Sequence, residues 1–162
     1  MNIRVLNMMN QTQKKSHLIR NIAIAAIVII LLFIVVNYIV TYRSSIPTTF
    51  TFSNTINISP LSFEYLSINV PSSAKDATLS IYFIVQGGSG NDIRCYVMDP
   101  TNFVNWENNQ QAYFIYNSGQ VTTAKATISL PGPGTYYVVF DNTFSVFSYK
   151  IVNYTITLSY YT

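Results

Sequence analysis

The sequence has very little of what disulfide chemistry or metal binding requires. Its 162 residues include one cysteine, Cys95, and one histidine, His17. A lone cysteine cannot form an intramolecular disulfide, so the chain must depend on its hydrophobic core for stability. We expect Cys95 to be a buried, inert thiol, with an intermolecular disulfide as the alternative. A zinc site needs clustered Cys and His side chains, and the sequence offers no such cluster.

Charge is also scarce, at 9% of the residues, and it is unevenly divided. Residues 1–42 carry four basic side chains and no acidic one, whereas residues 43–162 carry five basic and six acidic side chains. The net charge of +3 therefore comes from the N-terminal segment. Because residues 43–162 have no basic surplus, we exclude nucleic acid as a partner.

The groups that catalysis would need are missing as well. His17 lies in the N-terminal segment, so residues 43–162 cannot form a Ser-His or Cys-His nucleophile pair. Gly87-Gly88-Ser89-Gly90 is rich in glycine but leads into a strand-like segment, so it does not resemble a phosphate loop. We predict no enzyme activity, no cofactor and no small-molecule substrate. Calcium stays open as an alternative, because four acidic residues lie in or beside predicted loops: Asp92, Asp99, Glu107 and Asp141.

An unbroken apolar run dominates the N-terminal part. Residues 22–36 read IAIAAIVIILLFIVV, and the segment 21–40 is about as long as a bilayer is thick when helical. The run lacks proline, glycine and charge, and Tyr38 and Tyr42 stand at its far end, where aromatic anchors are common. We predict a transmembrane helix over 21–41 that contacts the lipid bilayer.

The flanking charges predict the orientation of this helix. Lys14, Lys15 and Arg20 precede the run, and only Arg43 closely follows it. By the positive-inside rule, residues 1–20 form a basic cytoplasmic tail, 42–47 a linker and 48–162 an extracytoplasmic domain of a single-pass cell-membrane protein. The alternatives are a cleaved signal peptide and a pilin-type leader. No small-x-small cleavage site follows the run, and Arg20 interrupts the pattern of a pilin leader.

Residues 48–162 show the alternation of half-buried strands and no helical periodicity. Turn sequences separate the apolar stretches, notably Pro71-Ser72-Ser73 and Pro131-Gly132-Pro133-Gly134. We predict an all-β, antiparallel eight-stranded β-sandwich of jelly-roll type. Its strands are Thr48–Ile58, Leu61–Val70, Ala77–Gln86, Asp92–Met98, Gln111–Tyr116, Val121–Leu130, Gly134–Phe140 and Tyr149–Tyr160.

Residues 134–152 carry a motif with a physical meaning of its own. Tyr136, Val138 and Phe140 share one strand face and should be core, and Gly134 frees the backbone to enter the strand. We expect short polar side chains to close the strand, two phenylalanines to pin the connection onto the sandwich, and a lysine near Asp141 to open the last strand. These residues are Asp141, Asn142, Phe144, Ser145, Phe147 and Lys150.

This motif, together with Val85-Gln86-Gly87-Gly88 and Asp99-Pro100, resembles the GOLD (Golgi dynamics) domains, the lumenal domains of vesicle-cargo receptors. The resemblance implies the eight-stranded fold and a protein-binding habit. The chain departs from those receptors in having one cysteine instead of a pair, and an anchor that precedes the domain. It also lacks a coiled coil. The resemblance therefore does not imply vesicle sorting.

We predict a binding module that contacts another membrane or envelope protein. The candidate interface is Phe103, Val104 and Trp106, apolar residues in a polar connection between strands. If Trp106 instead folds back over the core, this interface is lost. The alternative is a structural accessory subunit of a membrane complex, surface layer or pilin-like filament, held through its helix. Possible glycosylation sites are Asn57 and Asn153.

Overall fold

The computed structural model describes residues 3–44, 46–88 and 90–162. Ser45 of the predicted linker and Ser89 of the glycine-rich loop lie outside the described residues. The chain divides into two compact units, Met1–Ile46 and Pro47–Thr162, which are considered separately.

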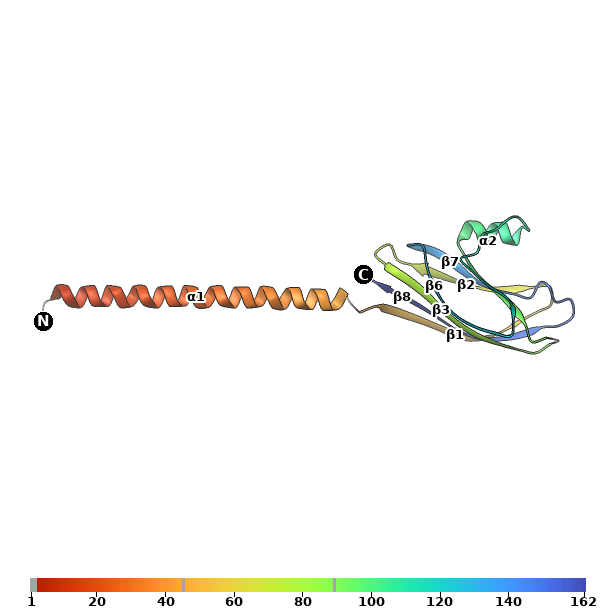
Figure 1. Ribbon diagram of the computed structural model, residues 1–162, viewed down its shortest axis with the longest axis horizontal. Coiled ribbons are helices and arrows are strands. Elements are labelled where there is room, and N and C mark those ends of the chain that lie inside the picture. Colours follow the sequence, from red (N-terminus) through yellow and green to blue (C-terminus); the bar gives the residue numbers. More distant parts are fainter. Residues whose placement is uncertain (1–2, 45, 89) are drawn as a thin grey trace. The chain divides into compact units, whose positions relative to one another are not determined.

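The first unit is one helix, α1 (Ile3–Ser44), which begins well before the predicted residue 21 (Figure 1). No glycine or proline precedes Pro47, so nothing in the basic segment breaks the helix. The stretch Gln13–Tyr42 contains a window of 18 residues with a mean hydropathy of 3.1, and it is long and apolar enough to cross a membrane. Near the far end, the Asn37 side chain donates to the carbonyl of Phe33 at 2.7 Å. The predicted transmembrane helix is thus supported.

The second unit is the predicted β-sandwich of two four-stranded antiparallel sheets (Figure 1). Sheet A has the strand order β1-β8-β3-β6, and sheet B has the order β2-β7-β4-β5. The strands are β1 (Thr48–Ile58), β2 (Phe63–Val70), β3 (Lys75–Gln86), β4 (Ile93–Met98), β5 (Tyr116–Val121), β6 (Thr123–Ser129), β7 (Gly134–Asp141) and β8 (Lys150–Tyr161).

The main core lies between the two sheets and follows the period of two that the sequence shows. Alternate residues of β3 and β8 are buried, and Tyr136, Val138 and Phe140 of β7 face them, as predicted. The Phe140 ring packs against Phe83 and Tyr154, with centroid separations of 5.5 and 5.2 Å. Cys95 is fully buried in the same core, and this burial raises the pKa of its thiol far above the ordinary value.

Two predictions in the middle of the domain are wrong. Residues Pro100–Glu107 form a helix, α2, where no helix was expected. The fifth strand is Tyr116–Val121, not Gln111–Tyr116. Its sequence YNSGQV has no alternation of apolar and polar residues. The strand is held to β4 by backbone pairing and by the Ser118 hydroxyl, which accepts from the Cys95 N–H at 2.8 Å. Strand signals that rest on apolar alternation miss such a segment.

Candidate binding groove beside helix α2

Helix α2 forms because its N-terminus carries two standard start signals. The Asp99 carboxylate accepts from the backbone N–H of Asn102 at 2.8 Å, and Pro100 occupies the first turn. The Asn102 side chain also donates to Asp99 and accepts from the Tyr113 N–H, which ties the following segment to the helix. The pair Asp99-Pro100 was therefore the signal that the strand-based interpretation overlooked.

The helix covers the outer face of sheet B and builds a second, smaller core there (Figure 1). Phe103 is only 8% exposed and stacks on Tyr137 at 4.4 Å. Tyr96, Met98 and Val139 of the sheet complete the buried set. The expectation that Phe103 is an exposed anchor is consequently wrong. The segment is a helix instead of a loop, and Phe103 lies on the face of this helix that packs against sheet B.

Trp106 occupies an intermediate position. It is half-buried and packs edge-on against Phe63, with 4.9 Å between ring centroids. The indole also forms one wall of a groove of about 320 Å³, the α2 groove. This groove is lined by Leu61, Phe63, Trp106, Glu107, Asn109 and Thr143. Val104 is 52% exposed on the helix but does not line the groove.

Two residues of the α2 groove have left-handed backbone conformations. Leu61 has φ of 58° and Asn109 has φ of 55°. Asparagine tolerates this region, whereas for leucine it costs roughly 1–2 kcal/mol. Leu61 is nevertheless 62% exposed, so its side chain gains little from burial in return. Residues held in unfavourable conformations concentrate at functional sites, which makes this groove the candidate site.

Asn142 of the closing motif holds Leu61 in this conformation. Its side-chain nitrogen donates to the carbonyls of Ser59 and Ser148 at 3.0 and 2.9 Å, and to that of Ile58 at 3.3 Å. Its backbone N–H donates to the Ser62 carbonyl. The Leu61 N–H in turn donates to the carbonyl of Ser145 at 2.9 Å. The β1–β2 connection is thus joined to the β7–β8 loop on both sides of Leu61.

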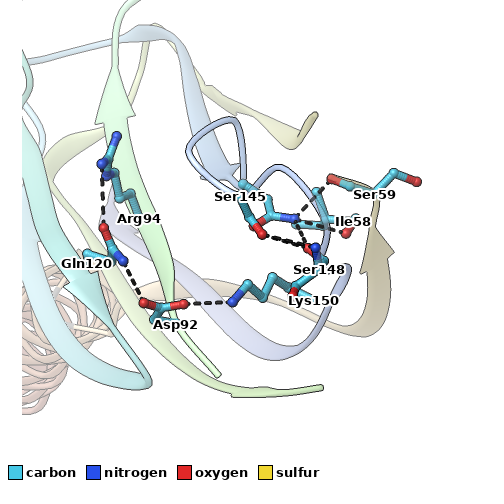
Figure 2. A network of polar contacts seen from close by, with 9 residues as sticks. Ile58, Ser59, Asp92, Arg94, Gln120, Ser145, Ser148 and Lys150 are labelled. Atoms are coloured by element: carbon cyan, nitrogen blue, oxygen red, sulfur yellow. Dashed lines mark hydrogen bonds and ion pairs between the residues drawn. The ribbon is translucent and has the colours of Figure 1, made fainter. Parts of the chain in front are cut away.

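A polar network lies beside this junction (Figure 2). The buried Lys150 donates to Asp92 at 2.7 Å, and Gln120 connects Asp92 to Arg94. Arg94 also lies 3.8 Å from the buried Asp141 carboxylate and 4.6 Å from the centre of the Phe144 ring. Lys150 does open the last strand as predicted, but its carboxylate partner shown here is Asp92.

Two pKa values in and beside this network are shifted. Burial of Asp92 disfavours its charge, but hydrogen bonds from Gln120 and Lys150 and the Lys150 charge outweigh it and lower the pKa of Asp92. Burial, followed by the charge of Asp141, raises the pKa of the Tyr96 hydroxyl. The lowered pKa of Asp92 reflects its pairing with Lys150, whereas the raised pKa of Tyr96 reflects mainly its burial.

Most residues of the closing motif are buried or hydrogen-bonded within the domain, with one exception. The Tyr136 hydroxyl donates to the Gly132 carbonyl at 2.8 Å and closes the preceding turn, and Gly134 has φ of 141°. Phe144 is half-buried beneath Arg94. Phe147 is 93% exposed, so the expectation that it pins the loop onto the sandwich is wrong. Within the loop the Ser145 hydroxyl donates to the Ser148 carbonyl at 3.0 Å, and the Ser145 carbonyl joins the loop to the β1–β2 connection by accepting from the Leu61 N–H.

The remaining predicted sites lie elsewhere. Asn57 and Asn153 are both exposed and sit in the adjacent strands β1 and β8, away from the α2 groove. Within the described ranges, no group of three or more His, Cys, Asp or Glu side chains is placed to hold a metal ion. Of the acidic residues considered for calcium, Asp92, Asp99 and Asp141 have protein partners.

Residues 69–161 match the family model described as emp24/gp25L/p24 family/GOLD. The chain belongs to this family. The match confirms the resemblance seen in the closing motif and covers α2, Trp106 and Asn142 of this GOLD domain. Strand β1 and Leu61 lie outside the matched segment. The comparison with curated proteins finds no match.

Among solved structures, the GOLD domain is similar to the disulfide-linked pili of Bacillus endospore appendages at 11% identity and a TM-score of 0.42, over 73% of this chain and 92% of that one. It is also similar to the Yersinia pseudotuberculosis-derived mitogen at 11% identity and a TM-score of 0.38, over 72% and 88% of the two chains. Likenesses this weak carry no functional argument.

Proposed function

We propose that this protein is a membrane-anchored binding module whose GOLD domain lies outside the cytoplasm and contacts another membrane or envelope protein through the α2 groove. Support for the anchor comes from the apolar helix α1, and support for protein binding comes from the family. The orientation rests on the basic residues that precede the apolar run.

The observation that carries the proposed site is the exposed Leu61 held in a left-handed conformation opposite Trp106. The groove has a mixed lining: Leu61, Phe63 and Trp106 are apolar, and Glu107, Asn109 and Thr143 are polar. An aliphatic or aromatic side chain of a partner protein would fit such a site, with hydrogen bonds at the rim. The lining residues include no Lys or Arg, which argues against capture of an anionic lipid headgroup.

Leu61→Gly provides a sharp test, because glycine adopts φ of 58° without strain. The variant removes the exposed side chain while the backbone keeps its path, so the domain should fold at least as stably as the wild type. We expect the amount of partner protein that co-purifies with this variant to fall about tenfold. This is the loss for a side chain that contributes about 1.4 kcal/mol to binding. The measurement is quantitative mass spectrometry of proteins that co-purify with the full chain in mild detergent.

Phe147→Ala is the matched control. It also removes an exposed apolar side chain, but one that does not line the groove. Capture of the same partner should survive this change. If both variants lose partner capture equally, or if Leu61→Gly keeps full capture, the binding surface does not lie at the α2 groove.

A further inference from the structure

Strand β1 is an edge strand with an open side. It pairs with β8 along its whole length, Thr48 opposite Tyr160 and Ile58 opposite Lys150, without a bulge. Sheet A ends there, and within the described part of the chain no strand pairs with the other edge of β1. One edge of this eleven-residue strand therefore carries backbone groups that do not pair within the sheet.

The side chain of Asn54 shows which backbone groups face the open edge. Its Oδ1 accepts from the N–H of Thr55 at 2.8 Å, so that N–H is not part of the β8 ladder. Because backbone groups alternate along a strand, the N–H and C=O groups of the odd-numbered residues point to the open edge. These residues are Thr49, Thr51, Ser53, Thr55 and Asn57.

The other three edge strands each carry a charge or an irregular register that discourages pairing, whereas β1 has only the Asn54 side chain on one outward N–H, which must turn aside for a new strand to pair. Strand β2 contains Glu64 and β6 contains Lys125. Strand β5 has six residues, and its register with β4 is shifted. The sequence of β1, TTFTFSNTINI, contains no charge and no proline. Charges, bulges and prolines are the usual protection of sheet edges, so β1 is the least protected of the four edges.

The core-side face of β1 is also left uncovered. Phe50 and Phe52 lie opposite Leu158 and Ile156 of β8, which are 3% and 0% exposed. The two phenylalanines are 49% and 38% exposed, so the apolar surface continues from the core past the region that sheet B covers. An added strand would bring side chains that cover this surface.

We propose that β1 pairs with β1 of a second copy of this chain, antiparallel and centred on Ser53, and joins two A sheets into one. This register overlaps all eleven residues and places odd-numbered residues opposite odd-numbered ones, which are the residues with outward backbone groups. It also sets Phe50 opposite Ile56 of the second copy. No charge occurs on either strand, so like charges never meet.

Two features favour a second copy over an unrelated strand. The edge is complementary to itself about Ser53, as a twofold interface requires. Each copy also begins β1 four residues after the end of α1, so anchoring in one membrane would raise the effective concentration of these edges. The proposal is independent of the α2 groove, whose residues belong to β2, α2 and the loops.

The first test is a disulfide across the twofold axis. In a hydrogen-bonded antiparallel pair the Cα atoms are about 5.5 Å apart, which a disulfide spans. Ser53→Cys in the full chain, in native membranes or mild detergent, should give mostly covalent dimer under mild oxidation. Lys125→Cys is the control, since Lys125 lies in the same row of sheet A at its opposite edge. The native Cys95 is fully buried and gives the background level.

The second test blocks the edge at the cost of one exposed side-chain hydrogen bond within the domain, between the hydroxyls of Thr51 and Thr157. Thr51→Pro removes an N–H that points to the open edge, so the β8 ladder keeps its hydrogen bonds. Combined with Ser53→Cys, it should reduce the covalent dimer to background while the thermal unfolding midpoint stays near the wild-type value. The proposal is overturned if Ser53→Cys gives no more dimer than Lys125→Cys. It is also overturned if a folded Thr51→Pro variant still forms the dimer.

Discussion

The Nζ atom of Lys150 donates to Oδ1 of Asp92 at 2.7 Å, although the Lys150 side chain is only 1% exposed. A buried ammonium is costly unless a charged acceptor meets it. Strand β8 therefore begins with a buried positive charge, and the β3–β4 connection supplies the negative charge that pairs with it. This pair joins the two segments at the loop end of the sandwich (Figure 2).

Asp92→Asn should lower the free energy of unfolding by about 1.5–3 kcal/mol, the range for a hydrogen bond between charged groups. Because the pKa of Asp92 is lowered in the folded state, its contribution is present above its unfolded pKa of about 3.9. The contribution is lost as the pH falls below that value through the folded pKa. Chemical denaturation between pH 2.5 and 7 measures this, and the variant should show the smaller loss on acidification. Parallel pH profiles for the two proteins would contradict the assignment.

Phe140→Ala and Phe147→Ala separate the two environments of one motif. Phe140 is 1% exposed and packs between Phe83 and Tyr154, so its truncation should cost about 3–5 kcal/mol. Phe147 is 93% exposed, and its truncation should change the stability by less than about 0.5 kcal/mol. Urea unfolding of the full chain in detergent, followed by tyrosine and tryptophan fluorescence, compares the two. Similar losses would mean that the β7–β8 loop packs differently.

Asn142→Ala should cost about 1–3 kcal/mol, since it removes a buried donor from carbonyls of the β1–β2 connection and the β7–β8 loop. A single local hydrogen bond would predict only about 1 kcal/mol. Asn142→Asp should be worse than Asn142→Ala, because a carboxylate cannot donate to those carbonyls. The readout is again equilibrium unfolding. A neutral Asn142→Ala variant would show that Leu61 is held by other contacts.

Membrane topology is tested by protease accessibility. Protease added to intact cells or spheroplasts should digest the domain after Pro47 and leave the segment around Lys14 and Lys15 protected. Antibodies against tags at the two ends report which end survives, and permeabilised cells provide the control. A protected C-terminal tag in intact cells would reverse the orientation proposed from the basic residues.

The amino-acid order alone was enough for the anchor, the fold class, the family and the face of β7 that is buried. These properties depend on local patterns: an uninterrupted apolar run, a period of two, and the spacing of the closing motif. Tyr136 and Phe140 could be placed in the core because alternation within one strand decides which face is apolar.

Other properties came only from the tertiary structure, because they depend on which distant segments meet. Phe103 is buried and Trp106 lines a groove because α2 folds onto the outer face of sheet B. Lys150 meets Asp92, 58 residues away, and Leu61 is held by Ser145 in a conformation that leucine does not prefer alone. Likewise the sequence of β1 does not distinguish an edge strand from a central one. Only the strand order of sheet A shows that one of its edges is open.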